Sequence, residues 1–327
     1  MRTRHSILSL LAVGCLATSA QAQECTPRIL ATLKMHHAEA GSEIRTVPVS
    51  INGVEKRMVL DTGGAITQMS RRTIQEMNLP LRRSGAKVFD INGRVSSHFT
   101  LIDKFGFGHL ERDRAALMVW PEPARPWAGI IAQDMLQAYD IDVDFASDEL
   151  KMYARDCPRP PASTRNASRI PMQNKGWHLH IPVVLDGKTY DGIFDTGSRN
   201  TIMTMLTARR DFGISPDTHE MTRYPAINGV TSLNGYLHSF SKLSVGGVEV
   251  DSPRLLLLPD VMNRNADRSP LARSRARRHS DGLVLPELTL GMSVMKNLRL
   301  YISFSEQALY VAPAVAPEGV PGNMVKP

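Results

Sequence analysis

The chain has 327 residues, of which 42% are hydrophobic and 22% are charged, a composition typical of a folded soluble protein with enough length for two hydrophobic cores. Its formal net charge is +7, but six arginines fall within residues 263–281 and two more within the first four residues. Because the positive charge is concentrated in this way, the sequence does not indicate a nucleic-acid-binding surface.

Residues 1–22 are predicted to be a secretory signal peptide. Basic residues precede an apolar run, Ile7–Ala17, that is too short to span a bilayer comfortably, and Ala20–Ala22 fits a small-x-small cleavage site. No later segment reaches the roughly 20 apolar residues of a membrane helix. We therefore expect an exported mature chain that begins at Gln23 and is periplasmic or secreted.

The chain contains three cysteines. Cys15 lies in a stretch that faintly resembles a lipoprotein cleavage box, but cleavage there would leave a very short signal, so lipid anchoring is the less favoured alternative. Cys25 and Cys157 remain after export. An oxidising compartment permits a disulfide between them, which would join the start of the first half of the chain to its end. Two free buried thiols are the alternative.

The same order of predicted elements occurs twice. In the first half, an alternating strand over 46–52 turns at Asn-Gly into a strand over 54–60 that ends at Asp61. In the second half, a strand over 181–185 turns at Asp-Gly into a strand over 188–194 that ends at Asp195. Three equivalent pairs are each 134 residues apart: Pro48 and Pro182, Gly53 and Gly187, and Asp61 and Asp195.

Each half continues in the same way. A short helix is predicted over 71–77 and again over 205–211, and an Asn-Gly hairpin follows in both halves. Each half then closes with an apolar motif, at 129–136 and 288–295, followed by two strands. The tripeptides of the hairpins are Ile91, Asn92 and Gly93 in the first half and Ile227, Asn228 and Gly229 in the second.

These repeats predict two lobes, over 23–157 and 169–312, joined by a Pro-rich linker over 158–168 and followed by a flexible tail over 313–327. The second lobe carries an insertion that contains the Arg-rich segment 263–281, which we expect to be disordered. A solvated loop is the simplest interpretation. The alternatives are cleavage during maturation, or a weak contact of residues 264–278 with an acidic partner or a membrane surface.

The two apolar-Asp-Thr-Gly turns and the later closing motifs resemble those of the aspartic peptidases, specifically the retropepsin-like branch and its two-lobed single-chain relatives. The resemblance spans roughly residues 27–312 and implies an all-β, bilobal fold of two homologous β-barrel lobes with the active site in the cleft between them. It implies that Asp61 and Asp195 are the catalytic pair and that the two Asn-Gly hairpins are flaps over the substrate. The residues implied to support the pair are Thr62, Gly63, Thr196, Gly197 and Ser198.

Two adjacent carboxylates suit peptide hydrolysis because they cannot both ionise easily and so share one proton. One then acts as a base towards water while the other acts as an acid towards the peptide carbonyl. This chemistry predicts an aspartic endopeptidase that acts on peptides or proteins and needs no cofactor. Because one chain carries both aspartates, we also expect a monomer.

The sequence departs from the family pattern at two positions. Gly64 stands where the family usually has Ser, Thr or Ala, so we expect Asp61 to lack a hydrogen bond that Ser198 offers to the second turn. Ala132 replaces the glycine of the first closing motif and is expected to crowd the backbone beneath Asp61.

Other interpretations fit the sequence less well. Isolated Asp-Thr-Gly turns are common, and phosphate-binding folds of the actin type also place Asp and Gly on hairpins, but they need more helical sequence. A peptidase-like protein that binds peptides without cutting them remains the alternative function. His178 and His180 share a strand face and His36 adjoins His37, but none has a partner at metal-ligand spacing, so no metal site is predicted and solvent-facing histidines are favoured.

Overall fold

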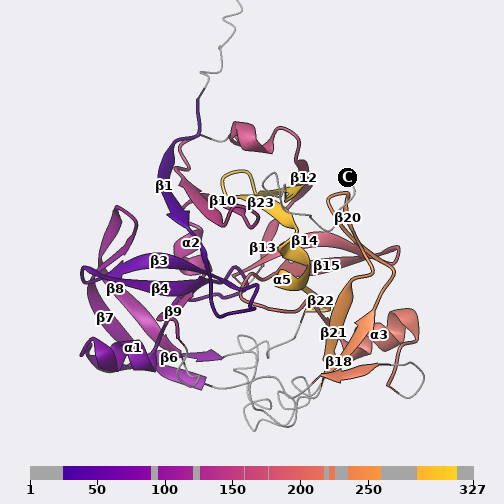
Figure 1. Ribbon diagram of the computed structural model, residues 1–327. Coiled ribbons are helices and arrows are strands. Elements are labelled where there is room, and N and C mark those ends of the chain that lie inside the picture. Colours follow the sequence, from indigo (N-terminus) through magenta and orange to yellow (C-terminus); the bar gives the residue numbers. More distant parts are fainter. Residues whose placement is uncertain are drawn as a thin grey trace, which may run out of the picture.

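We analysed a computed structural model, which describes residues 25–89, 95–120, 126–157, 159–175, 177–216, 221–224, 235–258 and 286–314. The predicted signal peptide, the Arg-rich segment, both hairpin tripeptides and nearly all of the tail lie outside these ranges. In Figure 1 the first half of the chain forms the purple lobe on the left, the second half forms the orange lobe on the right, and a further sheet lies above them.

The N-terminal lobe is an eight-stranded sheet in the order β2-β3-β4-β9-β5-β8-β7-β6. Two short helices, α1 (Arg71–Glu76) and α2 (Gln133–Leu136), follow β5 and β9. The strands are β2 (His36–His37), β3 (Arg45–Ile51), β4 (Val54–Leu60), β5 (Gln68–Ser70), β6 (Leu81–Phe89), β7 (Val95–Phe107), β8 (Leu110–Trp120) and β9 (Gly129–Ile131).

The C-terminal lobe is a ten-stranded sheet in which β17-β18-β21-β16-β22-β15-β14-β19-β20 follow one another and β13 pairs with β14. Its helices are α3 (Met205–Phe212) and α5 (Met292–Met295). The strands are β13 (Gln173–Lys175), β14 (His178–Leu185), β15 (Lys188–Phe194), β16 (Ile202–Thr204), β17 (Thr222–Tyr224), β18 (Gly235–Ser239), β19 (Lys242–Val245), β20 (Val248–Asp251), β21 (Arg254–Leu258) and β22 (Leu288–Leu290).

The two lobes repeat one hairpin with the predicted turn chemistry. β3 pairs with β4 and β14 pairs with β15, both antiparallel. Asn52 and Gly53 have φ of 50° and 80°, and Asp186 and Gly187 have φ of 43° and 81°. A two-residue turn of type I′ needs positive φ at both positions, which Asn, Asp and Gly tolerate best. The all-β, two-lobed fold and the internal duplication are therefore confirmed.

A third sheet joins the lobes, in the order β1-β11-β10-β23-β24-β12. β10 of the first half pairs with β23 of the second, with Ile141 opposite Ile302. The division of the sequence into two lobes and a linker did not anticipate this shared sheet. Its strands are β1 (Ile29–Lys34), β10 (Asp140–Asp144), β11 (Glu149–Tyr153), β12 (Ser168–Pro171), β23 (Leu298–Ser303) and β24 (Ala308–Pro313), and η1 (Ala162–Thr164) precedes β12.

Cys25 and Cys157 form a disulfide in the structure, with their Cα atoms 5.6 Å apart. The bond ties the segment before β1 to the segment after β11, and these two strands are neighbours in the joining sheet. Because it closes a loop of 132 residues, the chain-entropy model assigns it a stabilisation of about 4–5 kcal/mol.

Candidate active site

Asp61 and Asp195 each come directly after a buried strand end. The strand β4 ends in the buried residues Val59 and Leu60, and the N–H of Asp61 donates to the carbonyl of Ile131 at 2.9 Å. In the second lobe, the N–H of Asp195 makes the equivalent bond to the carbonyl of Leu290 at 2.8 Å. Both carboxylates are therefore carried on backbone that is anchored to a neighbouring parallel strand.

The glycine of each turn lies against the aspartate of the other lobe. A Cβ atom placed on Gly63 would be 2.2 Å from the Cγ atom of Asp195, and one on Gly197 would be 2.6 Å from the Cγ atom of Asp61. Any side chain at these positions would overlap the opposite carboxylate. The two turns therefore meet face to face, and glycine is required at both positions because of this close approach.

The two threonines lock the turns together. The N–H of Thr62 donates to the hydroxyl of Thr196 at 3.1 Å, and the N–H of Thr196 donates to the hydroxyl of Thr62 at 3.0 Å. Each hydroxyl in turn donates across the interface, from Thr62 to the carbonyl of Phe194 at 3.0 Å and from Thr196 to the carbonyl of Leu60 at 2.6 Å. Both threonines are buried, so these four bonds hold the lobes in one register.

Backbone N–H groups bind both carboxylates. Gly64 donates to Oδ1 of Asp61 at 2.7 Å, and Gly197 donates to Oδ1 of Asp195 at 2.8 Å. Burial, with the neighbouring charge of Asp195, raises the pKa of Asp61 well above its ordinary value. Burial also raises the pKa of Asp195, but hydrogen bonds and the nearby His178 oppose that rise. The pair titrates as a unit, because two carboxyl groups so close together cannot both ionise easily.

The two departures from the family pattern compensate for each other. A Cβ atom on Gly64 would lie 3.0 Å from Oδ2 of Asp61 and 3.1 Å from the Cβ atom of Ala132. Because Gly64 has no side chain, there is room beside Asp61 for the methyl group of Ala132. In the second lobe glycine is required at the equivalent position for another reason, because a Cβ atom on Gly291 would lie 2.1 Å from the backbone carbonyl oxygen of Asn200.

Ser198 contacts the second turn through its backbone, because its N–H donates to the carbonyl of Asp195 at 3.2 Å. Its hydroxyl donates to the carbonyl of Asn200 at 2.9 Å and is not hydrogen-bonded to Asp195. The difference between the two aspartates therefore does not arise from the serine that Gly64 lacks.

A second layer of polar residues beneath the turns was not singled out from the sequence. Both the N–H and the hydroxyl of Thr67 donate to Oδ1 of Asp134, at 2.9 and 2.6 Å. In the second lobe, the N–H of Thr201 donates to the hydroxyl of Ser293 at 2.9 Å. Thr67 and Thr201 are 134 residues apart. Applying the offset of the two aspartates to every polar residue would have found them.

The predicted flap tripeptides, 91–93 and 227–229, lie outside the described residues, but the strands on either side of them are paired. Phe89 of β6 is opposite Val95 of β7, and Tyr224 of β17 is opposite Gly235 of β18. Both tripeptides are therefore bracketed by antiparallel strand pairs.

Among the described residues, no group of three or more His, Cys, Asp or Glu side chains is placed to hold a metal ion. His36 and His37 are exposed, as expected. His178 and His180, which the strand pattern predicted to face solvent, are instead only partly exposed, and the Nδ1 atom of each is buried.

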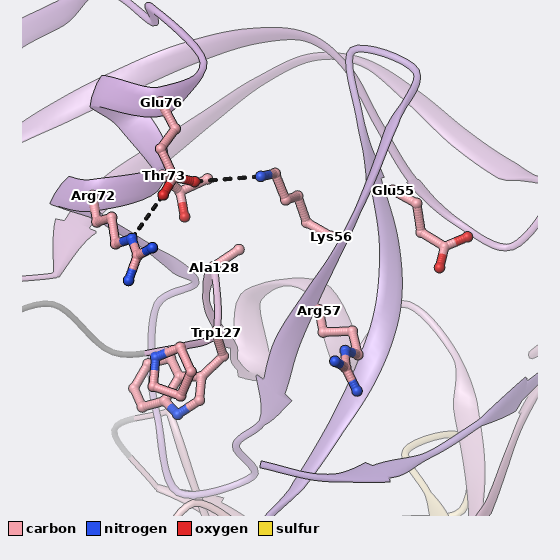
Figure 2. A pocket seen from close by; sticks show the side chains of 9 residues that line it. Glu55, Lys56, Arg57, Arg72, Thr73, Glu76, Trp127 and Ala128 are labelled. Carbon is pink, nitrogen blue, oxygen red and sulfur yellow. Dashed lines mark hydrogen bonds and ion pairs between the residues drawn. The ribbon is translucent and has the colours of Figure 1, made fainter. Parts of the chain in front are cut away.

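A separate cavity of about 270 Å³ lies on the N-terminal lobe beside α1 (Figure 2). Two of its basic residues, Lys56 and Arg72, share the carboxylate of Glu76. Neither Asp61 nor Asp195 lines this cavity, so it is not part of the aspartate site. Within the described part of the chain, no helix is long and apolar enough to cross a membrane.

The site is a pair of facing Asp-Thr-Gly turns at the junction of two duplicated β lobes, which is the arrangement of an aspartic peptidase. The aspartyl protease family matches the sequence over residues 47–135 and 181–294, more than half of the chain, and the protein belongs to this family. Comparison with curated proteins gave no match.

Comparison with solved structures gave, among others, two matches. Conglutin gamma, a basic 7S globulin from lupine seeds, is 8% identical, with 89% of this chain and 96% of that chain covered and a TM-score of 0.48. An aspartic proteinase from Irpex lacteus is 12% identical, with 86% and 97% covered and a TM-score of 0.47.

Proposed function

We propose that the protein is an aspartic endopeptidase that hydrolyses peptide bonds of protein substrates, with Asp61 and Asp195 activating a water molecule between them. The observation that supports this most is the reciprocal fit of the two turns. Gly63 lies against Asp195 and Gly197 lies against Asp61, so the two carboxyl groups occupy the same small space. Such closeness is what a proton-sharing pair requires.

The ionised carboxylate takes a proton from the water as the water oxygen attacks the peptide carbonyl. The protonated carboxyl donates its hydrogen bond to the carbonyl oxygen as negative charge develops there. Collapse of the tetrahedral intermediate breaks the C–N bond, and the leaving nitrogen takes up a proton from the pair. The threonine lock keeps both carboxyl groups in place throughout, so little reorganisation accompanies the reaction.

The proposed substrate is an extended peptide that lies across the two turns and gains strand-like main-chain hydrogen bonds. In this proposal the tripeptides at 91–93 and 227–229 act as flaps that close over the peptide and exclude water. Two paired strands beneath each tripeptide give a flap a firm base.

The test is cleavage of casein and of a peptide library by the purified protein, with and without pepstatin, across the acid to neutral pH range. Asp61→Asn and Asp195→Asn should each abolish cleavage. Glu55→Gln on β4 and Asp191→Asn on β15 are matched controls, because these exposed carboxylates lie on the same two strands and should leave cleavage intact. Cleavage that survives both Asp61→Asn and Asp195→Asn would overturn the assignment. Peptide binding without cleavage by the unaltered protein would favour the non-catalytic alternative.

We also propose that the protein acts in an exported, oxidising compartment. The disulfide between Cys25 and Cys157 supports this, because such bonds persist mainly outside the reducing cytosol. Cell fractionation followed by mass spectrometry of the mature N-terminus is the direct check, with Gln23 as the expected first residue.

A further inference from the structure

One row of side chains crosses the N-terminal sheet from the strand that leads to Asp61. Val59, two residues before this aspartate, is the parallel partner of Ile130, and Ile130 is the antiparallel partner of Gln68. The residues that follow them in the three strands all belong to the hydrophobic core: Leu60, Ile131 and Met69. Because side chains alternate between the two faces of a sheet, the row lies on the face away from that core.

Asp61 lies on the same face as this row. Its N–H donates to the carbonyl of Ile131 at 2.9 Å, so the pairing of β4 with β9 and the alternation of side chains continue through it. Its carboxylate lies beside Ala132, because a Cβ atom on Gly64 would be 3.0 Å from Oδ2 of Asp61 and 3.1 Å from the Cβ atom of Ala132. Ala132 comes two residues after Ile130 and so belongs to the same face. The row therefore begins beside the proposed reacting carboxylate.

Gln68 is the polar residue of the row. It is 7% exposed, and its Oε1 atom is buried with no hydrogen-bond partner among the described residues. Its neighbours on the adjacent strands, Ile130 and Met118, have apolar side chains that offer no donor. Buried polar atoms of side chains are nearly always partnered when they support the fold. The unpartnered oxygen can instead accept a hydrogen bond from an N–H or O–H group of a bound molecule.

The C-terminal lobe repeats the row with an alkyl side chain in place of this amide. Ile193, two residues before Asp195, is the parallel partner of Thr289, and Thr289 is the antiparallel partner of Ile202. Ile202 follows Gln68 by 134 residues, the same offset that separates the two aspartates. The two lobes therefore present different chemistry at equivalent places on either side of the aspartate pair.

We propose that Gln68 is a specificity-determining residue, whose side-chain oxygen accepts a hydrogen bond from a substrate side chain. The preferred substrates are peptides with an amide, hydroxyl or ammonium group at that place, and the inference rests on the proposed peptidase function. Gln68 lies two strands from β4, which is roughly 10 Å at about 4.8 Å per strand. An extended peptide spans this distance in roughly three residues. The selected side chain is therefore within about three residues of the cleaved bond, on one side of it only.

The first test measures kcat/KM for peptides that carry glutamine, methionine or the γ-methyl ester of glutamate in turn at each of three positions on either side of the cleaved bond. These side chains are similar in size, but only glutamine donates a hydrogen bond. The unaltered protein should prefer glutamine by about tenfold at one position, the effect of one buried hydrogen bond.

Gln68→Ile, which copies the residue of the other lobe, should lose this preference and still cleave the methionine peptide. Ile202→Gln should add a second preference for glutamine on the opposite side of the cleaved bond. Gln75→Ile, at an exposed position on α1, is the matched control and should change neither preference. A preference for glutamine that is the same in Gln68→Ile and in the unaltered protein would overturn the proposal.

The second test needs no catalysis. Binding of the same peptides, labelled with a fluorophore, is measured by fluorescence anisotropy in Asp195→Asn and in Asp195→Asn/Gln68→Ile. Tighter binding of one glutamine peptide by the first variant, lost in the second, supports the proposal even if the unaltered protein cleaves nothing and the proposed function fails. Equal affinities for the three side chains at every position, or no binding of any peptide, would overturn it.

Discussion

Asp142 of the first half of the chain and Arg299 of the second form a two-point ion pair inside the sheet that joins the lobes. The Nε and Nη2 atoms of Arg299 lie 3.1 and 2.8 Å from the two carboxylate oxygens of Asp142. The side chain of Asp142 is 2% exposed, so its charge depends on this partner. The pair fixes β10 against β23 at the point where the two lobes meet.

Replacing Arg299 with Met should therefore destabilise the protein, because it leaves the buried carboxylate of Asp142 without its cation. The expected loss is about 3 kcal/mol in the free energy of unfolding, measured by urea denaturation. Asp142→Asn in the same chain should recover much of that loss, since it removes the uncompensated charge. If Arg299→Met alone leaves the urea midpoint unchanged, the pair contributes nothing to the junction.

The threonine lock predicts a loss of both stability and activity when either hydroxyl is removed. Thr62→Val keeps the shape of the side chain but leaves the buried N–H of Thr196 without its acceptor. Such an orphaned group costs about 1–3 kcal/mol, and the turns lose their fixed register. Thr62→Ser is the control, because it keeps the hydroxyl. Thermal unfolding and peptide cleavage are the two measurements, and equal behaviour of the Val and Ser variants would contradict the prediction.

Gly64 and Ala132 should behave as a coupled pair. Gly64→Ser adds a Cβ atom that is crowded by the methyl group of Ala132 and by a carboxylate oxygen of Asp61. The substitution should therefore lower the free energy of unfolding by about 1–3 kcal/mol and reduce cleavage. Ala132→Gly removes one of these two neighbours. The double variant should therefore be more stable and more active than Gly64→Ser alone. Additive losses in the double variant, seen by denaturation and kcat, would show that the two positions are independent.

The raised pKa of Asp61 has a consequence for stability as well as for catalysis. An acid whose pKa is higher in the folded protein favours folding at pH values below its pKa in the unfolded chain. That contribution is lost as the pH rises through its pKa in the folded protein. Asp61→Asn should therefore stabilise the protein near neutral pH, by about 1–2 kcal/mol. The advantage should disappear below the ordinary carboxyl value of 3.8, where Asp61 is protonated in both states. Urea unfolding at several pH values checks the sign.

Much of the fold could be predicted from the sequence, because the same local patterns occur in both halves of the chain. The type I′ turns at 52–53 and 186–187 and helices α1 and α3 follow from turn chemistry and periodicity within short windows. The two Asp-Thr-Gly turns were recognisable because equal spacing from Pro48 and Pro182 rules out coincidence. Each of these features needs only neighbouring residues to define it.

The features that were missed depend on contacts between distant parts of the chain. β1 pairs with β11, and β12 pairs with β24. No local sequence pattern indicates which distant strands pair with each other. The direction of the Ser198 hydroxyl and the burial of Nδ1 in His178 are likewise set by neighbouring segments. Alternation along β14 showed that His178 and His180 share a face, but not that the face is covered.

The order of strands in the joining sheet determines how much of the chain must be made before both aspartates are held in place. β23 and β24 lie among the last described residues, yet they occupy the middle of a sheet that also contains β1. A growing chain can complete the first lobe, but that lobe supplies one aspartate and an unpaired edge at β10. The second aspartate comes at residue 195, but β22, whose Leu290 carbonyl anchors it, and β23 and β24, which complete the joining sheet, come only after residue 287. A chain that stops before β22 therefore has both Asp-Thr-Gly sequences but lacks the Leu290 carbonyl that anchors Asp195 and the strands that close the joining sheet.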